Sequence, residues 1–397
     1  MSRGGTVISD LPDDLLRRIL FFAPAKEGAS TAVLSRRWRR LWLSSGAVNI
    51  HWPADKRLCT SKQWRSLFDV PEAALAAVHA HGPVRRLTFH GGVELYRSEP
   101  YTIVAALSHP AARHVEELRF TVVQDDEAAG GKHGNKPWRR GKYTLHLGDL
   151  PSEDLGTLHL ARCSISSNLM PPPAELAFPW LAVLRMEACT VFMEQLNRVI
   201  DAAPRLATLH IERTWLMLFG VVEEVVRANK QAPWSWSSRL RGPAVTALVL
   251  VDCEWPNYVR MDLDMPRLRY FRYKGHVPQL SLLGSSPAVN IAQVDVHFME
   301  EEVNNTAGGG GGGDAMTTTR DRMRSFFWKF IQCFYNASIL KVRLDYLIEH
   351  VAVAKEDQDE IICPNKFFSN LDRLEIEAPH IASSDGTALA LLLSCGS

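Results

Sequence analysis

The sequence lacks long apolar runs. No stretch of its 397 residues approaches the roughly 18 consecutive apolar residues that a membrane-spanning helix needs, and its first residues contain no apolar core of a signal peptide. It also lacks an excess of charge, because 45 Lys and Arg residues against 44 Asp and Glu residues leave a formal net charge of +1. A balanced chain exerts no global attraction on nucleic acid or on an anionic membrane. We therefore expect neither a membrane nor nucleic acid as a partner.

Cysteine is sparse, and its seven residues are widely spaced. A zinc site needs close ligand pairs such as Cys-x-x-Cys, and the sequence contains none, so no metal is expected. An odd number of cysteines without tight pairing favours a reducing compartment over a disulfide-bonded extracellular one. The expected location is the nucleus, the cytoplasm or both.

Catalytic motifs are also missing. The sequence contains no His-Glu-x-x-His and no Gly-x-Ser-x-Gly motif, and its 14 histidines are scattered. The six consecutive glycines Gly308–Gly313 lack the Lys-Ser/Thr pair that a phosphate-binding P-loop requires. Together with their polar neighbours they predict a disordered insertion over 300–319. We expect a protein that is not an enzyme and needs no cofactor.

The sequence does contain two short amphipathic segments close to its start. Pro12, Asp13 and Asp14 suit the first turn of a helix, and Pro24 ends it. The apolar residues of this first segment recur at helical spacing: Leu11, Leu15, Leu16, Ile19 and Leu20. The second segment carries a stripe made of Leu34, Trp38, Leu41 and Trp42, opposite Arg36, Arg37, Arg39 and Arg40.

Two helical segments of this length bury too little surface to be stable alone. We therefore interpret them as a docking module whose apolar stripes a partner protein covers, with the arginines forming a solvated helix face. Two alternatives stay open. The segments can be the N-terminal cap of the domain that follows, or the arginines can form a nuclear-localisation or nucleic-acid-binding patch.

Residues 8–50 resemble an F-box of the plant type. The resemblance rests on Ile8-Ser9-Asp10-Leu11-Pro12-Asp13-Asp14-Leu15-Leu16 and on Leu34-Ser35-Arg36-Arg37-Trp38-Arg39-Arg40-Leu41-Trp42. It implies binding to a Skp-family adaptor and, through that adaptor, to a cullin of an SCF-type ubiquitin ligase. The adaptor contacts that it implies are Leu11, Pro12, Leu15, Leu16, Ile19, Leu20, Val33, Leu34 and Trp38. The chain departs from the family pattern at residues 21–24 and at Gly28, which replaces a helix former, and both departures are expected to lower adaptor affinity.

A leucine-rich repeat follows the first module. The template Leu-x-x-Leu-x-Leu-x-x-Cys-x-Ile is matched by Leu155–Ile165, Leu181–Val191, Leu206–Leu216 and Val245–Trp255. The central leucines of the first three copies, Leu158, Leu184 and Leu209, are 26 and 25 residues apart. Weaker copies centre on Leu87, Leu118, Phe271, Val294, Val342 and Leu374.

Each copy predicts a short strand followed by a returning segment that is often helical, and the copies stack because none closes a core alone. Returning helices are predicted over Glu194–Ala203, Val221–Ala228 and Met323–Phe334. Cys163, Cys189 and Cys253 share one template position and should be buried in the turn. Leu145–Leu147 precedes the next copy too closely for a full repeat, so a truncated turn or an extra local strand is expected there.

The predicted fold class is an α/β solenoid, with a small all-α F-box module followed by a curved leucine-rich-repeat domain of parallel strands. The predicted boundaries are 5–50 for the module, 51–83 for a linker with the N-terminal helix of the repeat domain, and 84–397 for the repeats. The residue between the two central apolar positions of each copy should point away from the core. The predicted target-binding residues occupy this position: Arg119, His159, Arg185, His210 and Arg272.

Arginine pairs with carboxylates and phosphates through two parallel hydrogen bonds. One hypothesis is therefore a strand face that prefers an acidic or phosphorylated segment, and the alternative is a solvated sheet surface without preference. The function that the resemblance implies is that of a substrate-recognition subunit of an SCF-type ligase, which holds an unidentified target on the repeats. A scaffold or decoy that binds partners without any ligase is the alternative.

Overall fold

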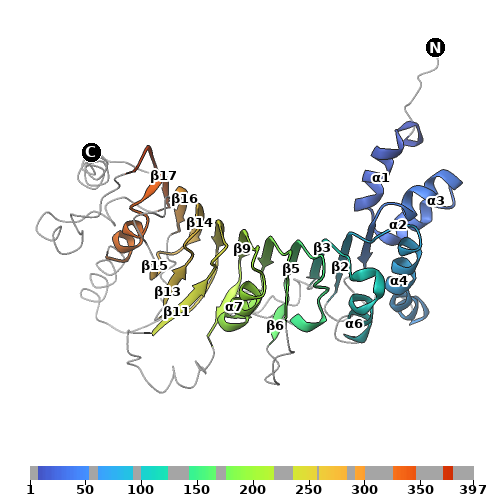
Figure 1. Cartoon of the computed structure of the whole chain (residues 1–397), viewed down its shortest axis with the longest axis horizontal. Coiled ribbons are helices and arrows are strands. Elements are labelled where there is room, and N and C mark those ends of the chain that lie inside the picture. The colour runs from blue at the N-terminus through green and yellow to red at the C-terminus, as the bar shows by residue number, and fades with distance from the viewer. Residues whose placement is uncertain are drawn as a thin grey trace, which may run out of the picture. The chain divides into compact units, whose positions relative to one another are not determined.

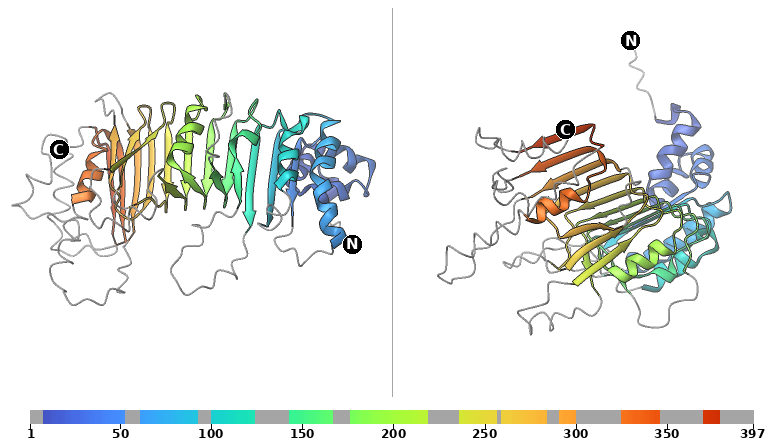
Figure 2. Two further views of the ribbon diagram at one scale, coloured as in Figure 1. Left: turned by 90° about the horizontal axis from the view of Figure 1, so that it is seen from below. Right: turned by 60° about the vertical axis from the view of Figure 1, so that its left-hand side comes forward.

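A computed structural model describes residues 8–52, 61–92, 100–123, 143–166, 176–218, 236–256, 259–283, 291–299, 325–345 and 370–378 (Figure 1). The chain divides into two compact units. The first comprises Met1–Val191 with Ala202–Arg205, and the second comprises Phe192–Asp201 with Leu206–Ser397. The expected fold class is confirmed, because a small helical module is followed by repeat strands that pair in parallel (Figure 2).

The first unit begins with the helical module. A single turn, η1 (Ile8–Asp10), precedes α1 (Asp13–Phe22), α2 (Ala25–Thr31) and α3 (Arg36–Leu43). Pro12 and Pro24 stand directly before α1 and α2, where a missing backbone N–H has no cost. The side chain of Ser35 caps α3 by accepting a hydrogen bond from the backbone N–H of Trp38.

Gly28 allows α2 and α3 to pack closely. A Cβ atom added at Gly28 would lie 2.5 Å from both Cδ1 and Nε1 of the Trp42 indole. Trp42 is buried, so its ring has little room to move away. The departure from the family pattern at Gly28 therefore has a packing reason inside this chain.

The strands of the first unit form a parallel series. In spatial order they are β1 (Ala47–His51), β2 (Arg86–Gly92), β3 (Glu117–Val123), β5 (Thr157–Ala161) and β7 (Val183–Glu187). The copies predicted around Leu87 and Leu118 are confirmed as β2 and β3, whereas β1 was not predicted because it carries no leucine template. The returning segments include α4 (Ser61–His79), α6 (Pro100–Ser108) and η3 (Pro110–Ala112), and α4 and α6 lie on one face of the sheet (Figure 1).

The strands of the second unit form another parallel series. Their order is β9 (Thr208–Glu212), β12 (Ala247–Val251), β14 (Tyr270–Gly275), β16 (Ile291–Phe298), β17 (Ala337–Leu344) and β18 (Arg373–Glu377). These strands confirm the weak copies at Phe271, Val294, Val342 and Leu374. Some returning segments here are strands that form their own parallel sheet: β11 (Trp236–Arg241), β13 (Val259–Asp264) and β15 (Leu280–Leu283).

Two of the three predicted returning helices fall within the described residues and are confirmed. The first is α7 (Met193–Asp201), whose Leu196, Val199 and Ile200 are buried. The second spans residues 325–332 and buries Phe327, Phe330 and Ile331. The rings of Phe330 and Phe334 pack against aromatic residues of β14 and β16.

The short spacing around Leu145 is explained by an extra local strand. The strand β4 (Thr144–His146) pairs with β6 (Ser164–Ser166), which in turn pairs with the first residues of β8 (Thr190–Phe192). Two other predictions lie outside the described residues: the helix Val221–Ala228 and the glycine-rich insertion 300–319. Within the part of the chain that is described, no helix has the length and apolar character needed to cross a bilayer.

A left-handed residue marks the turn of each clear repeat. Arg162, Ala188, Arg213 and Asp252 have φ angles between 46° and 57°, although none of them is glycine. Each directly precedes the template position that holds Cys163, Cys189, Thr214 or Cys253.

Side chains at this template position donate hydrogen bonds to backbone carbonyls near the ends of strands. The Cys189 thiol donates to the carbonyl of Leu160, and the Thr214 hydroxyl donates to that of Glu212. Burial raises the pKa of the Cys253 thiol to about 12, which keeps it protonated as a donor to the Ile211 carbonyl. The prediction that these cysteines are buried turn residues is confirmed for Cys163 and Cys189, and Cys253 is partly buried.

The left-handed turn generates a stability prediction. Ala188 and Ala161 are both buried, but Ala188 has a φ of 51° and Ala161 ends a strand. Ala188→Gly loses a methyl worth about 0.8 kcal/mol but relieves roughly 1 kcal/mol of left-handed strain. Ala161→Gly loses the methyl and adds about 0.5–1 kcal/mol of backbone entropy cost. Urea unfolding should therefore show little change for the first variant and a clear loss for the second; equal losses would contradict this account.

The packing of Gly28 generates a second prediction. Gly28→Ala improves helix propensity by about 1 kcal/mol, but overpacking against a buried ring costs about 1–3 kcal/mol. We expect a net loss in the free energy of unfolding and a lower melting temperature. Ser30→Ala, on the exposed side of the same helix, serves as the control and should be nearly neutral. A Gly28→Ala variant that is more stable than the unmodified protein would rule out the close α2–α3 contact.

Candidate docking surface

Exposed large apolar side chains gather on the helical module. Among the residues that the structure describes, they are Ile8, Leu15, Ile19, Phe22, Val33, Leu34 and Trp180. All of them except Trp180 belong to residues 8–34. Isolated exposed apolar residues are normal on a protein surface, but a concentration on one small module is typical of an interaction site.

Helix α1 has two apolar sides. Leu16 and Leu20 are buried in the module, whereas Leu15 and Ile19, one turn apart, are 52% and 43% exposed. The loop between α2 and α3 contributes Val33 and Leu34, which are 89% and 69% exposed. Leu11 is half-buried and Pro12 is exposed at the start of α1.

The structure corrects the expectation that both early tryptophans await a partner. Trp38 and Trp42 are only 6% and 8% exposed, because α3 packs against α1, α2 and α4 of the same chain. The Trp38 indole N–H also donates a hydrogen bond of 3.2 Å to the Ser9 hydroxyl. Of the nine predicted adaptor contacts, Leu16, Leu20 and Trp38 are thus core residues of the module. The six that reach the surface are Leu11, Pro12, Leu15, Ile19, Val33 and Leu34.

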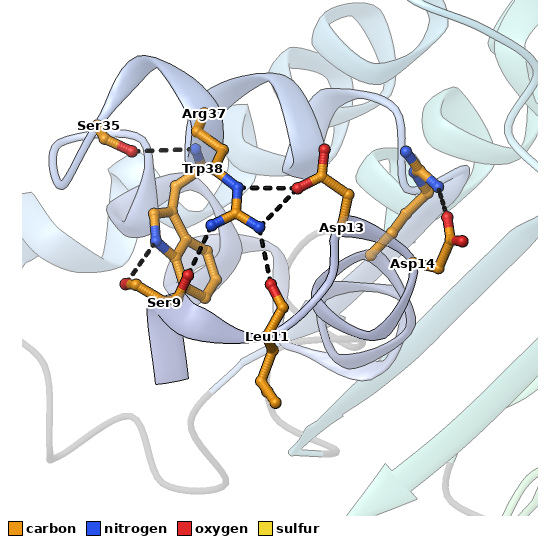
Figure 3. Close-up of polar contacts among 8 residues, drawn as sticks. Ser9, Leu11, Asp13, Asp14, Ser35, Arg37 and Trp38 are labelled. Atoms are coloured by element: carbon orange, nitrogen blue, oxygen red, sulfur yellow. Dashed lines mark hydrogen bonds and ion pairs between the residues drawn. The ribbon is translucent and has the colours of Figure 1, made fainter. Parts of the chain in front are cut away.

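Arg37 joins the start of α3 to the start of α1 (Figure 3). Its guanidinium donates to the carbonyl oxygens of Ser9 and Leu11 at 2.6 and 2.7 Å. It also donates to Oδ1 of Asp13 at 2.8 Å. Arg36, Arg39 and Arg40 are exposed as predicted, so Arg37 is the exception on this helix face. Nothing in the sequence distinguishes it from its neighbours.

This set of bonds, the Arg37 clasp, fixes the geometry of the surface. It holds η1 and the residues before α1 against the N-terminal end of α3 (Figure 3). Val33 and Leu34 immediately precede that end, and Leu11 and Pro12 immediately precede α1. The clasp therefore keeps two exposed apolar segments, which are distant in sequence, in a defined arrangement.

The predicted target-binding residues lie on the outward side of the repeat strands. In the first unit, Arg119, His159 and Arg185 stand opposite one another on β3, β5 and β7. His210 and Arg272 belong to the second unit, where Val249 separates them in the register. The structure thus brings three of the five into one row and places the other two in the other unit.

Carboxylates accompany this row of cations. Arg119 donates to Glu117 at 2.6 Å, and Nε2 of His159 lies 3.8 Å from Glu187. In the second unit, His210 lies 3.3 Å from Glu212, and Arg272 lies 3.9 Å from Asp295. The strand face is consequently a set of paired charges rather than a bare cationic surface. No group of His, Cys, Asp and Glu side chains within the described ranges has the arrangement of a metal site.

Comparison with known proteins identifies the helical module. Residues 8–46 match the F-box domain family. The chain is 28% identical over 208 residues to the putative F-box protein At3g44060 of Arabidopsis thaliana. The aligned region covers 52% of this chain and 44% of that protein. It is 24% identical over 307 residues to the Arabidopsis F-box/LRR-repeat protein At4g14103, and this alignment covers 75% of this chain and 68% of the relative.

Identity is higher over a shorter stretch. A stretch of 43 residues is 51% identical to the putative FBD-associated F-box protein At3g12840 of Arabidopsis, which covers 11% of this chain and 23% of that relative. The match to the first relative spans less than half of its length. The chain therefore carries an F-box domain followed by a leucine-rich-repeat region, as the plant F-box/LRR proteins do, and F-box proteins are generally non-catalytic adaptors.

The Arg37 clasp generates a prediction. Arg37→Met retains most of the side-chain stem but removes the donors to Ser9, Leu11 and Asp13. Because the side chain is partly exposed, we expect a loss of about 1–2 kcal/mol in stability. Amide hydrogen exchange should become faster over residues 8–13. Arg36→Met, which changes an exposed arginine next to it, is the control; equal effects of both variants would show that the clasp has no special role.

Proposed function

We propose that this chain is the substrate-recognition subunit of an SCF-type cullin–RING ubiquitin ligase. The observation that carries the proposal is the exposed apolar surface of the F-box domain, held in shape by the Arg37 clasp. In this proposal a Skp-family adaptor covers that surface, and the adaptor connects the chain to a cullin. The proposed location is the nucleus, the cytoplasm or both.

The adaptor contacts follow from exposure. Burying a large aliphatic side chain completely stabilises a complex by about 1.5–3 kcal/mol relative to leaving it exposed. Among the predicted adaptor contacts with large aliphatic side chains, Val33 and Leu34 are the most exposed, followed by Leu15 and Ile19. Leu11 and Pro12 complete the proposed contact at the start of α1. The contact surface also depends on the buried residues that pack α1 against α3, namely Leu16, Leu20 and Trp38.

In this proposal the chain performs no chemistry of its own. Its role is to bring a target close to the transfer machinery, which raises the effective concentration of the target there. The target is proposed to bind outward strand faces of the repeats. The candidate contacts are Arg119, His159 and Arg185 in the first unit and His210 and Arg272 in the second. A carboxylate or phosphate of the target would exchange with Glu117 or Glu187 as the partner of these cations.

The test is capture of a purified Arabidopsis Skp-family adaptor by the full chain. Two double variants are compared: Val33→Asp with Leu34→Asp, and Leu15→Asp with Ile19→Asp. Each should weaken binding by about 100-fold, because charges replace two apolar anchors that together contribute about 3 kcal/mol. Because these side chains are exposed, circular dichroism and the melting temperature should change little. Trp180→Asp, which alters the exposed apolar residue outside the module, should bind as the unmodified chain does.

The outcome separates the two functions considered. An unmodified chain that does not bind the adaptor would overturn the proposal and favour a scaffold or decoy. Adaptor binding that survives both double variants would also contradict it, because the contact would then lie elsewhere.

A further inference from the structure

The C-terminal end of α1 rests on the outward side of the first two strands of the repeat region. The link is Asn49 of β1, which is 3% exposed. Its side-chain amide nitrogen donates to the carbonyl of Phe21 at 3.0 Å and to that of Ala23 at 2.9 Å. Carbonyls in the last turn of a helix have no partner within the helix. Asn49, a residue of the strand β1, therefore caps the C-terminal end of α1 by bonding these free carbonyls.

Arg86 of β2 makes a second link. Its guanidinium carbon lies 4.7 Å from the ring centre of Phe22 and 5.4 Å from that of Phe21. Arg18 lies 5.0 Å from the Phe22 ring, so this ring has two guanidinium groups as neighbours. The Arg86 side chain is buried and reaches Glu117 of β3 at 3.5 Å. Planar guanidinium groups stack on aromatic rings more effectively than other cations do.

The covalent connection between the module and the sheet is short. Only Ser44, Ser45 and Gly46 separate α3 from β1. Gly46 has a φ of +73°, which favours glycine, and its carbonyl accepts hydrogen bonds from the backbone N–H groups of Arg85 and Arg86 at 2.8 and 3.2 Å. This turn, Asn49 and Arg86 thus attach the module to the sheet, in addition to the packing of α1 and α2 against β1.

We propose that Asn49 and Arg86 are positioning residues that set the orientation of the F-box docking surface relative to the strand face of the first unit. The strand register supports this assignment. Asn49 stands opposite Thr88, and Thr88 stands opposite Arg119, so all three occupy the row that points outward. In β3 that position faces solvent, whereas in β1 the module covers it.

This assignment defines where a target can bind. The module covers Asn49 of β1 and Arg86 of β2, whereas His51 at the end of β1 is exposed and Thr88 of β2 is partly exposed. The outward positions at Asn49 and Arg86 are therefore closed to a ligand. The contact of Asn49 and Arg86 with α1, which we call the joint, extends to the open strand face through Glu117. This carboxylate accepts hydrogen bonds from both Arg86 and Arg119. If the proposed function holds, Asn49 and Arg86 fix the direction in which a bound target is presented to the ligase.

The test measures the distance between the module and the sheet directly. Spin-labelled non-natural amino acids are placed at Ser30 in α2 and at Glu153 before β5, which are both exposed positions in the first unit. Pulsed electron paramagnetic resonance on the full chain should give one narrow distance distribution. Asn49→Asp, which replaces the donor by a carboxylate facing two carbonyls, and Arg86→Met, which removes the guanidinium, should each broaden or shift it.

Two matched controls should leave the narrow distribution intact. Arg119→Met removes the other arginine that bonds Glu117 but does not contact α1. Asn197→Asp alters an asparagine that bridges α7 and β11 in the second unit in a similar way. Circular dichroism and adaptor affinity, both expected to stay unchanged, show that the module itself is folded in each variant.

A broad distribution in the unmodified chain would overturn the proposal, and so would a narrow, unchanged one in the Asn49 and Arg86 variants. If the Asn49→Asp variant does not fold, the distance distribution of the Arg86→Met variant tests the proposal. The distance measurement needs no adaptor, so a chain that fails to bind the adaptor would refute the proposed function and still test this joint.

Discussion

The stacking of neighbouring strands is the constraint on which the rest of this structure depends. Each repeat presents one inward row of apolar side chains, such as Leu158 with Leu160 or Leu184 with Met186, and these rows are buried only because the adjacent repeats cover them. An end strand lacks such a neighbour on one side. In the first unit this strand is β1, and the F-box helices pack against it. The module that meets the ligase in our proposal therefore also closes the end of the first unit.

Sequence periodicity predicted the repeats well because their signal is local. Two leucines two residues apart and a cysteine three residues later specify a strand and its turn within a dozen positions, as in Leu158–Cys163. The strand β1 has the sequence Ala-Val-Asn-Ile-His and no such pattern, since its role is to pair with β2 and to hold α1 through Asn49. The left-handed φ at Ala188 was equally invisible, because the fold imposes it on a residue that does not favour it.

The F-box surface shows a different limit of sequence reasoning. The spacing of Leu15, Leu16, Ile19 and Leu20 predicts an apolar helix, but it does not say which of its two sides the chain itself buries. That choice follows from contacts between distant residues, such as Trp38 with Ser9 and Trp42 with Gly28. The resemblance to the F-box family identified the right segment, and only the structure separated its core from its surface. Likewise, one of four similar arginines, Arg37, holds the segment together.

Charge pairing on the strand face determines what kind of recognition it can support. The ion pair of Arg119 with Glu117 lies near the surface, with side chains that are 44% and 24% exposed. Because pairs near the surface contribute little to stability, an anionic group of a ligand can replace Glu117 at Arg119 at little cost. The same exchange yields little net affinity, because one pair replaces another. Binding strength must then come from apolar or shape contacts, and the charges select among ligands rather than hold them. Glu117 also accepts a hydrogen bond from Arg86. If an anion displaced Glu117 from Arg119, Glu117 would still be bonded to Arg86, which contacts α1. The target recognition that we propose for the strand face and the attachment of the module to the sheet would thus share one carboxylate.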